Sequence, residues 1–166
     1  MIFKKKEHTV NLYNILLSLS RNKFFYENVK LPDTFETRIL LMFFHFSLMM
    51  IIFKKKGHKL DQGLYDFLFH SIENDLRELG YGDVTVNKKM KDLNKILYDI
   101  LLKIEEKDSE GLFKINTNLV SRYFKELNDD KRENLVIFNT YFFKFFDFCF
   151  DLPLKNMIQK SINFKY

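Results

Sequence analysis

The residues that could support catalytic or metal chemistry are few and widely separated in this chain. Histidines stand at positions 8, 45, 58 and 70, and the only cysteine is Cys149. No two of them have the CxxC or HxxxH spacing that sets two zinc ligands side by side. None of the 5 glycines lies in a GxGxxG or GxxxxGK pattern, which a phosphate-binding loop needs. We therefore expect no catalytic residue, metal site, cofactor or small-molecule substrate, and hence a protein that is not an enzyme.

Residues 76–83, with the sequence Leu-Arg-Glu-Leu-Gly-Tyr-Gly-Asp, are the most informative polar segment. Gly80 stands where a helix C-terminus favours a positive φ, and Asp83 can cap a helix that begins near residue 85. Arg77 and the basic segment 88–91 would then border a compact junction between two long helices. The alternative is a hinge that serves folding alone.

Residues 137–151 predict a helix with an unusually wide apolar face. Its polar residues fall within an arc of about 60°, while aromatic and aliphatic residues fill about 240°, although a helix on one core needs only somewhat over 100°. Either neighbours cover this helix on two sides, or an aromatic ridge stays exposed for a partner. The ridge would follow Phe138, Phe142 and Phe145 or Phe143, Phe146 and Phe150. As candidate partner-binding residues on this helix we select Phe138, Phe142 and Phe146.

The elements that must position these residues are predicted to be helices almost throughout. The most apolar segment, Ile39 to Phe53, would be roughly 22 Å long as a helix, against about 30 Å of membrane hydrocarbon. We therefore expect a buried central helix over residues 34–55 rather than a membrane span, with His45 as a core histidine rather than a haem ligand. Further helices are predicted at 8–20, 61–79, 86–104, 116–127 and 130–150, with a short one after Pro153 and a loop at 108–111. No segment of useful length alternates with period two, so the expected fold is all-α, a single compact domain of about six to seven helices.

Composition and charge narrow the function classes. The chain has 166 residues, 46% of them hydrophobic, with 20 Phe and no Trp, which is too apolar for a disordered protein. A single cysteine excludes an intramolecular disulfide, and the first residues lack the apolar core of a secretory signal, so we expect the cytosolic side. The net charge of +5 makes an anionic partner plausible. The cluster Lys54, Lys55 and Lys56 is the candidate contact for an anionic membrane surface or for RNA.

Residues 12 to about 104 resemble the ubiquinol–cytochrome c chaperone family, the assembly factors for cytochrome b of respiratory complex III. The segment 76–83 is the most distinctive match. The other matching points, in chain order, are Leu12-Tyr13, Phe25-Tyr26, Pro32-Asp33-Thr34, Arg38, His45, Lys54 to Gly57, Leu64, Asp66, Phe69, Val86, Lys88, Met90 and Lys91. Beyond residue 105 the sequence shows little to match, so residues 12–104 form the family-like core and 105–166 a set of C-terminal helices.

The resemblance implies a non-enzymatic chaperone that binds newly made cytochrome b, its client, from a cytoplasmic position on the periphery of the inner membrane, whether of the bacterial or the mitochondrial-matrix type. A monomer is expected. The candidate partner-binding residues around the junction are Arg38, Arg77, Glu78, Asp83, Lys88 and Lys91. The rival interpretations are a small basic RNA- or ribosome-associated protein and a peripheral membrane protein, each without a cytochrome client.

Overall fold

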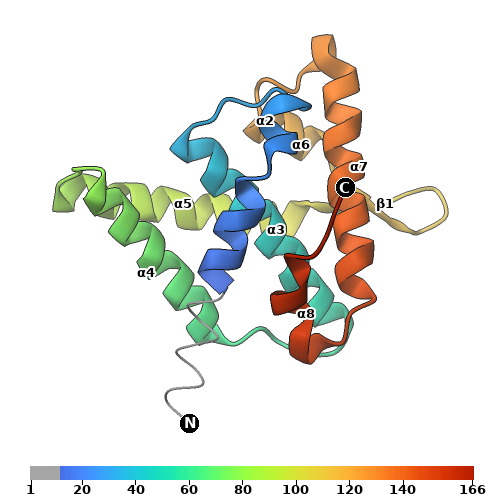
Figure 1. Ribbon diagram of the computed structural model, residues 1–166, viewed down its shortest axis with the longest axis horizontal. Coiled ribbons are helices and arrows are strands. Elements are labelled where there is room, and N and C mark those ends of the chain that lie inside the picture. The colour runs from blue at the N-terminus through green and yellow to red at the C-terminus, as the bar shows by residue number, and fades with distance from the viewer. Residues whose placement is uncertain (1–11) are drawn as a thin grey trace.

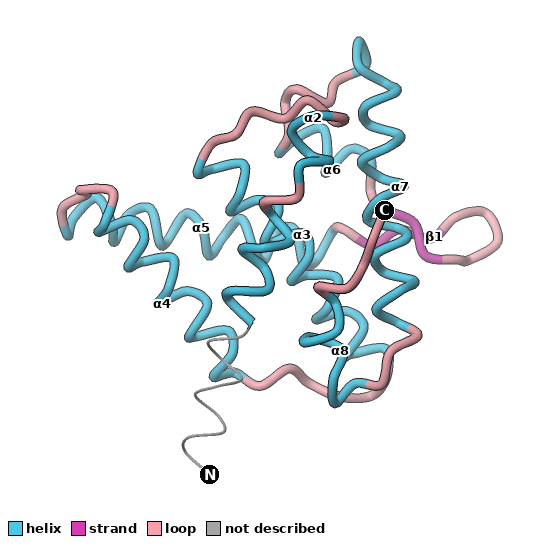
Figure 2. Tube along the Cα trace, in the orientation of Figure 1, coloured by secondary structure: helices cyan, strands magenta, loops and turns pink. Residues whose placement is uncertain are grey.

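The structure, a computed structural model, describes residues 12–166 and is built almost wholly of helices (Figure 1, Figure 2). The first described helix covers residues 12–20, so the start of the helix predicted from residue 8 lies outside the described residues. The elements that follow are α2 (Lys23–Glu27), α3 (Phe35–Lys55), α4 (Gln62–Glu78), α5 (Asp83–Lys103), β1 (Glu105–Lys107), β2 (Phe113–Ile115), α6 (Thr117–Tyr123), the 3-10 turn η1 (Asp129–Lys131), α7 (Arg132–Phe150) and α8 (Leu154–Ser161). The predicted all-α fold is confirmed.

Helix α3 is the centre of the molecule, between α5 on one side and α7 on the other (Figure 1). It begins where Pro32 interrupts the chain, and the Thr34 hydroxyl caps it by accepting a hydrogen bond from the Thr37 N–H at 3.2 Å. Among the described residues it is the one helix long and apolar enough to cross a membrane, and 72% of its most apolar window is buried inside the structure. The predicted central helix is therefore confirmed, although at 21 residues it is longer than the apolar stretch alone.

The wide apolar face of α7 is covered from several sides. Phe138 and Phe142 contact Phe25 of α2 and Phe44 of α3, and all four of these rings are fully buried. Farther along the helix, Phe146 stacks on Phe113 of β2 with ring centroids 3.9 Å apart. Burial on two sides, rather than an exposed ridge, therefore explains most of this aromatic arc.

The hairpin of β1 and β2 projects beyond α7 and was not expected from the sequence (Figure 1). Glu105 pairs with Ile115 and Lys107 with Phe113 in an antiparallel register. Strands of 3 residues are too short to produce a recognisable period-two alternation. The loop predicted at 108–111 is their connection, and the Asp108 carboxylate holds it by accepting hydrogen bonds from the N–H groups of Glu110 and Leu112.

Helices α4 and α5 form a hairpin that extends to one side of the other elements (Figure 1). Leu68 and Ile72 of α4 are buried, as are Leu97 and Ile100 of α5. Gly80, between the two helices, has a φ of +96°, the left-handed conformation predicted for a helix C-terminus. The hydroxyl of Tyr13 donates to the carboxylate of Asp75, which ties the first helix to α4.

Candidate functional site

An open apolar groove of about 240 Å³ lies where α3, α4, α5 and α6 meet, and we call it the junction groove. Its apolar lining comes from Phe35, Ile39, Leu40, Leu76, Tyr81, Leu93, Ile96 and Tyr123. Three charged residues, Glu36, Lys89 and Asp92, line it as well. The elements position these side chains because residues 35, 39 and 40 share one face of α3, and residues 89, 93 and 96 share one face of α5.

Tyr81 connects the groove to the turn between α4 and α5. The Lys89 ammonium lies over its ring, 4.7 Å from the ring centroid, in a cation–π contact. Leu79, Tyr81 and Val84 are all exposed at this turn, so the apolar surface of the groove continues onto it. A concave apolar surface with a charged border can bind apolar side chains whose polar neighbours stay in water.

Beside the groove, Arg77 bridges the end of α4 to the start of α5. Its guanidinium donates to the Glu73 carboxylate at 3.1 Å and also to the Asp83 carboxylate. These hydrogen bonds, first the one to Asp83, raise the pKa of Arg77. The prediction that Asp83 caps a helix starting near residue 85 is wrong, because α5 begins at Asp83 itself and Gly82 occupies the cap position.

The predicted site residues divide into those at the junction and those elsewhere. Arg77 and Asp83 touch, while Glu78, Lys88 and Lys91 are exposed at the end of α4 and along α5. Arg38 is not part of this group. It pairs with Asp33 at 2.6 Å in a separate pocket of about 340 Å³, whose other lining residues are Arg21, Lys23, Tyr26 and Glu27.

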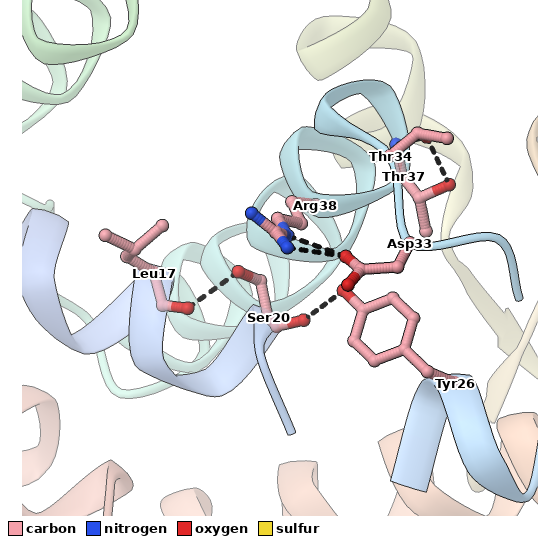
Figure 3. Close-up of polar contacts among 7 residues, drawn as sticks. All are labelled: Leu17, Ser20, Tyr26, Asp33, Thr34, Thr37 and Arg38. Atoms are coloured by element: carbon pink, nitrogen blue, oxygen red, sulfur yellow. Dashed lines mark hydrogen bonds and ion pairs between the residues drawn. The ribbon is translucent and has the colours of Figure 1, made fainter. Parts of the chain in front are cut away.

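Figure 3 shows Arg38 turned toward Asp33, and the hydroxyl of Tyr26 directed at the Ser20 carbonyl, to which it donates at 2.6 Å. The hydrogen bond from Arg38 to Asp33 raises the pKa of Arg38, and burial raises the pKa of Tyr26. Asp33 thus neutralises Arg38. Because Asp33 precedes α3 and Arg38 lies in its first turn, the ion pair between them fixes the entry into the helix.

Two of the three lysines proposed to meet a membrane or RNA have partners within the molecule. Lys55 forms an ion pair with Glu105 at 2.5 Å. The Lys56 ammonium donates to the Leu152 carbonyl at 2.9 Å and lies 5.0 Å from the ring centroid of Phe150. Lys54 is exposed. The cluster thus contributes to joining α3 to β1 and to the end of α7.

Phe138, Phe142 and Phe146, the candidate partner-binding residues of α7, are core residues with at most 5% of each exposed, so of the two alternatives for this helix they follow burial and not an exposed ridge. Of the second possible ridge, Phe143 and Phe150 remain exposed. The excess of Phe in α7 is used for packing, because rings from α2, α3 and β2 cover it.

His45 is a satisfied core histidine, as predicted. Its Nδ1 lies 2.6 Å from the Leu41 carbonyl oxygen, and its Nε2 lies 2.9 Å from the Tyr141 hydroxyl. Since a carbonyl can only accept, Nδ1 carries the proton and the Tyr141 hydroxyl donates to Nε2. Complete burial lowers the pKa of His45 to about 3, so the ring is neutral.

Sequence reasoning missed a polar cluster that connects α5 to α6 next to the groove. Asp99 accepts from Lys103 at 2.5 Å, from Arg122 at 2.7 Å and from the Tyr123 hydroxyl at 2.5 Å. The hydrogen bond with Lys103, followed by that with Tyr123, lowers the pKa of Asp99, and burial raises the pKa of Tyr123 to about 12. The i, i+4 spacing of Asp99 and Lys103 was a visible signal, but the α6 partners come from 23 and 24 residues away.

Groups of three or more His, Cys, Asp or Glu side chains placed to hold a metal ion are not found among residues 12–166.

Comparisons with known proteins identify the family. No curated protein sequence matches the chain. A crystal structure of the Cbp3 homolog from Brucella abortus superposes with a TM-score of 0.68, covering 99% of this chain and 94% of that one, at 19% sequence identity. At that identity, the TM-score shows a shared fold and nothing more. The sequence profile of the ubiquinol-cytochrome C chaperone family matches residues 27–142, well beyond residue 105, where the sequence alone had suggested that the resemblance ends. This match spans more than half of the chain, which therefore belongs to the ubiquinol-cytochrome C chaperone family.

Proposed function

We propose that this protein is a non-enzymatic assembly chaperone that binds newly made cytochrome b for respiratory complex III. The observation that carries the proposal is the junction groove, an open apolar surface beside the charged α4–α5 turn, in a chain of a chaperone family. An apolar client segment outside a membrane needs such a surface because its side chains are otherwise exposed to water.

The size of the groove determines how much of a client it can hold. Its volume of about 240 Å³ lies below the roughly 300–1,000 Å³ of pockets for drug-sized ligands. It therefore suits a few side chains on one face of an apolar helix, the anchors that a helix-in-groove complex uses. Polar groups that flank this apolar face would meet Glu36, Lys89 and Asp92, with Arg77 and Glu78 farther along the rim.

The family relationship also supports a place for this protein near the membrane in which complex III is assembled. We propose a peripheral position on the cytoplasmic or matrix-type side of the inner membrane. There, a client segment could pass from the ribosome to the groove and then to the assembling complex.

The test begins with deletion of the gene, which should lower both cytochrome b abundance and assembled complex III. Complementation then compares two variants. Tyr81→Ser combined with Leu40→Ser makes the groove polar, whereas Leu112→Ser removes an exposed apolar side chain from the β-hairpin. We expect the groove variant to capture less cytochrome b from cell-free synthesis and to restore less complex III, while the control restores both.

Thermal unfolding of both variants shows whether the fold is retained. Unchanged complex III after deletion would contradict the chaperone function itself. Full capture by a folded groove variant would contradict the groove as the binding site.

A further inference from the structure

The outward face of α5 carries a regular stripe of residues that lie outside the buried core and the groove lining. It consists of Val84, Lys88, Lys91, Lys95, Tyr98 and Leu102, and we call it the α5 stripe. One of them, Val84, also belongs to the exposed apolar surface of the α4–α5 turn, and the ring of another, Tyr98, lies 6.2 Å from that of Tyr65 in α4. The spacing alternates between four and three residues, so at 3.6 residues per turn all six lie within about 80° of the helix circumference. This is the signature of one continuous face along nearly the whole helix.

The apolar residues of the stripe are exposed to water. Val84 is 86% exposed, Leu102 is 79% exposed and Tyr98 is 53% exposed, whereas Leu97 and Ile100, on the other side of the helix, are buried. The stripe therefore places apolar side chains at both of its ends without any contribution to the core.

The charges of the stripe have one sign. Lys88, Lys91 and Lys95 are exposed, and none of them forms an ion pair with another residue in the described part of the chain. The acidic residues nearest in helical position are Asp92, which lines the groove, and Asp99, which Lys103 and Arg122 already neutralise. The face is thus basic in its middle and apolar at its ends.

We propose that the α5 stripe is the surface with which this protein docks on a membrane that contains anionic phospholipids. Lysine ammonium groups are attracted to anionic headgroups, and apolar side chains beside them enter the interfacial layer. From Val84 to Leu102 the stripe is about 27 Å long, so it lies along the membrane plane rather than touching it at a point. RNA would use the three lysines but would leave Val84 and Leu102 exposed, which is why lipid is the better fit.

Docking in this way would also orient the junction groove. Lys89, Leu93 and Ile96 line the groove from the side of α5 next to the stripe. A membrane beneath the stripe would therefore run past the mouth of the groove, where an apolar client segment leaves or enters lipid. This inference rests on the membrane location proposed above, but not on the identity of the client.

The experiment measures binding of the full chain to vesicles of phosphatidylcholine, with and without phosphatidylglycerol. We expect binding only with the anionic lipid. Lys88→Gln, Lys91→Gln and Lys95→Gln together should weaken it on the order of a hundredfold, since each lysine near an acidic surface contributes severalfold. The control, Lys125→Gln, Lys155→Gln and Lys160→Gln, changes the net charge equally at exposed sites elsewhere and should weaken binding much less.

A second variant, Val84→Ser with Leu102→Ser, separates lipid insertion from charge attraction. It should weaken binding at high salt, where the lysine contribution is screened. Equal losses in the two lysine triples would overturn the stripe as a defined surface. Binding of wild type to RNA but not to anionic vesicles would overturn lipid in favour of nucleic acid.

Capture of cytochrome b in solution, without vesicles, keeps this proposal apart from the chaperone function. Lys95 and Leu102 are stripe residues outside both the groove lining and the candidate client-binding residues of the junction, so Lys95→Gln combined with Leu102→Ser should weaken vesicle binding and still capture the client normally. If wild type binds vesicles through the stripe but captures no client, the docking surface stands and the proposed function fails.

Discussion

The α7 side and the α4–α5 hairpin of this molecule use their apolar residues in opposite ways. Around α7, rings from distant parts of the chain close over one another, and Phe138, Phe142 and Phe145 are fully buried. At the hairpin, Tyr81, Leu93 and Ile96 instead line an open groove with charged residues at its border. We call the α7 side the closed side and the α4–α5 hairpin the open side.

This difference teaches that the most conspicuous apolar segment of a sequence need not be its binding surface. A helix dense in Phe offers large areas for burial, so the rest of the chain covers it. The hairpin is less apolar, and only part of its surface is buried against the rest of the molecule. The remaining surface is left for the groove and for the α5 stripe.

The largest expected effect tests the closed side. Phe142→Ala should lower the free energy of unfolding by about 3–5 kcal/mol, because it removes a fully buried ring and leaves a cavity. Phe143, its neighbour, is 41% exposed, so Phe143→Ala should cost clearly less. Urea unfolding of both variants gives the comparison. Similar losses at the two positions would mean that α7 is not covered as described.

A second test concerns the buried His45 on the same side. Its pKa is about 3 in the folded state and about 6.5 when unfolded, so only the unfolded state gains a proton as the pH falls between these values. Folding stability from this residue is therefore complete above pH 6.5 and decreases below it, by about 2 kcal/mol between pH 7 and pH 5.

The measurement is the difference in pH slope between wild type and a His45→Gln variant. The variant should be less stable at neutral pH and should lose this part of the slope. Identical slopes would mean that His45 is reached by solvent in the folded state.

Local features of both sides could be predicted from the sequence, whereas contacts between distant segments could not. The central helix followed from the Ile39 to Phe53 run between charged ends, and the positive φ of Gly80 from its place after a helix. These are local signals. The groove depends on residues 35 and 123 meeting residue 81, which no local pattern encodes.

Arg38 shows the same limit. Its place beside Arg77 in the predicted site came from the resemblance, but α3 directs it toward Asp33 in another pocket. The burial of Phe146 could not be predicted for a related reason. Phe113, which covers it, comes from a hairpin too short to be recognised in the sequence.

A smaller effect on the free energy of unfolding is expected at the two glycines of the α4–α5 turn, on the open side. Gly80→Ser should lower the free energy of unfolding by about 1–2 kcal/mol, because a side chain is strained at a φ of +96°. Gly82→Ser should be neutral or slightly stabilising. Gly82 has a φ of −75° at the N-cap of α5, has open space around it, and would gain a capping hydroxyl.

Thermal unfolding of the two serine variants measures this contrast. Because the substitution is the same, the difference in midpoint reports the strain at Gly80 together with the cap gained at Gly82. Equal midpoints would contradict the left-handed turn at Gly80.

The smallest effect on stability is expected at Arg77, and it decides between the two interpretations of the turn. Both of its carboxylate partners lie at the surface, where ion pairs contribute little, so Arg77→Ala should leave the thermal midpoint almost unchanged. If the bridge to Glu73 and Asp83 holds the turn in the shape that a client needs, cytochrome b capture should nevertheless decrease. Arg77→Lys should capture an intermediate amount, because a single ammonium cannot reach two carboxylates with the geometry of a guanidinium fork. Full capture by a folded Arg77→Ala protein would leave the turn as a hinge that serves folding alone.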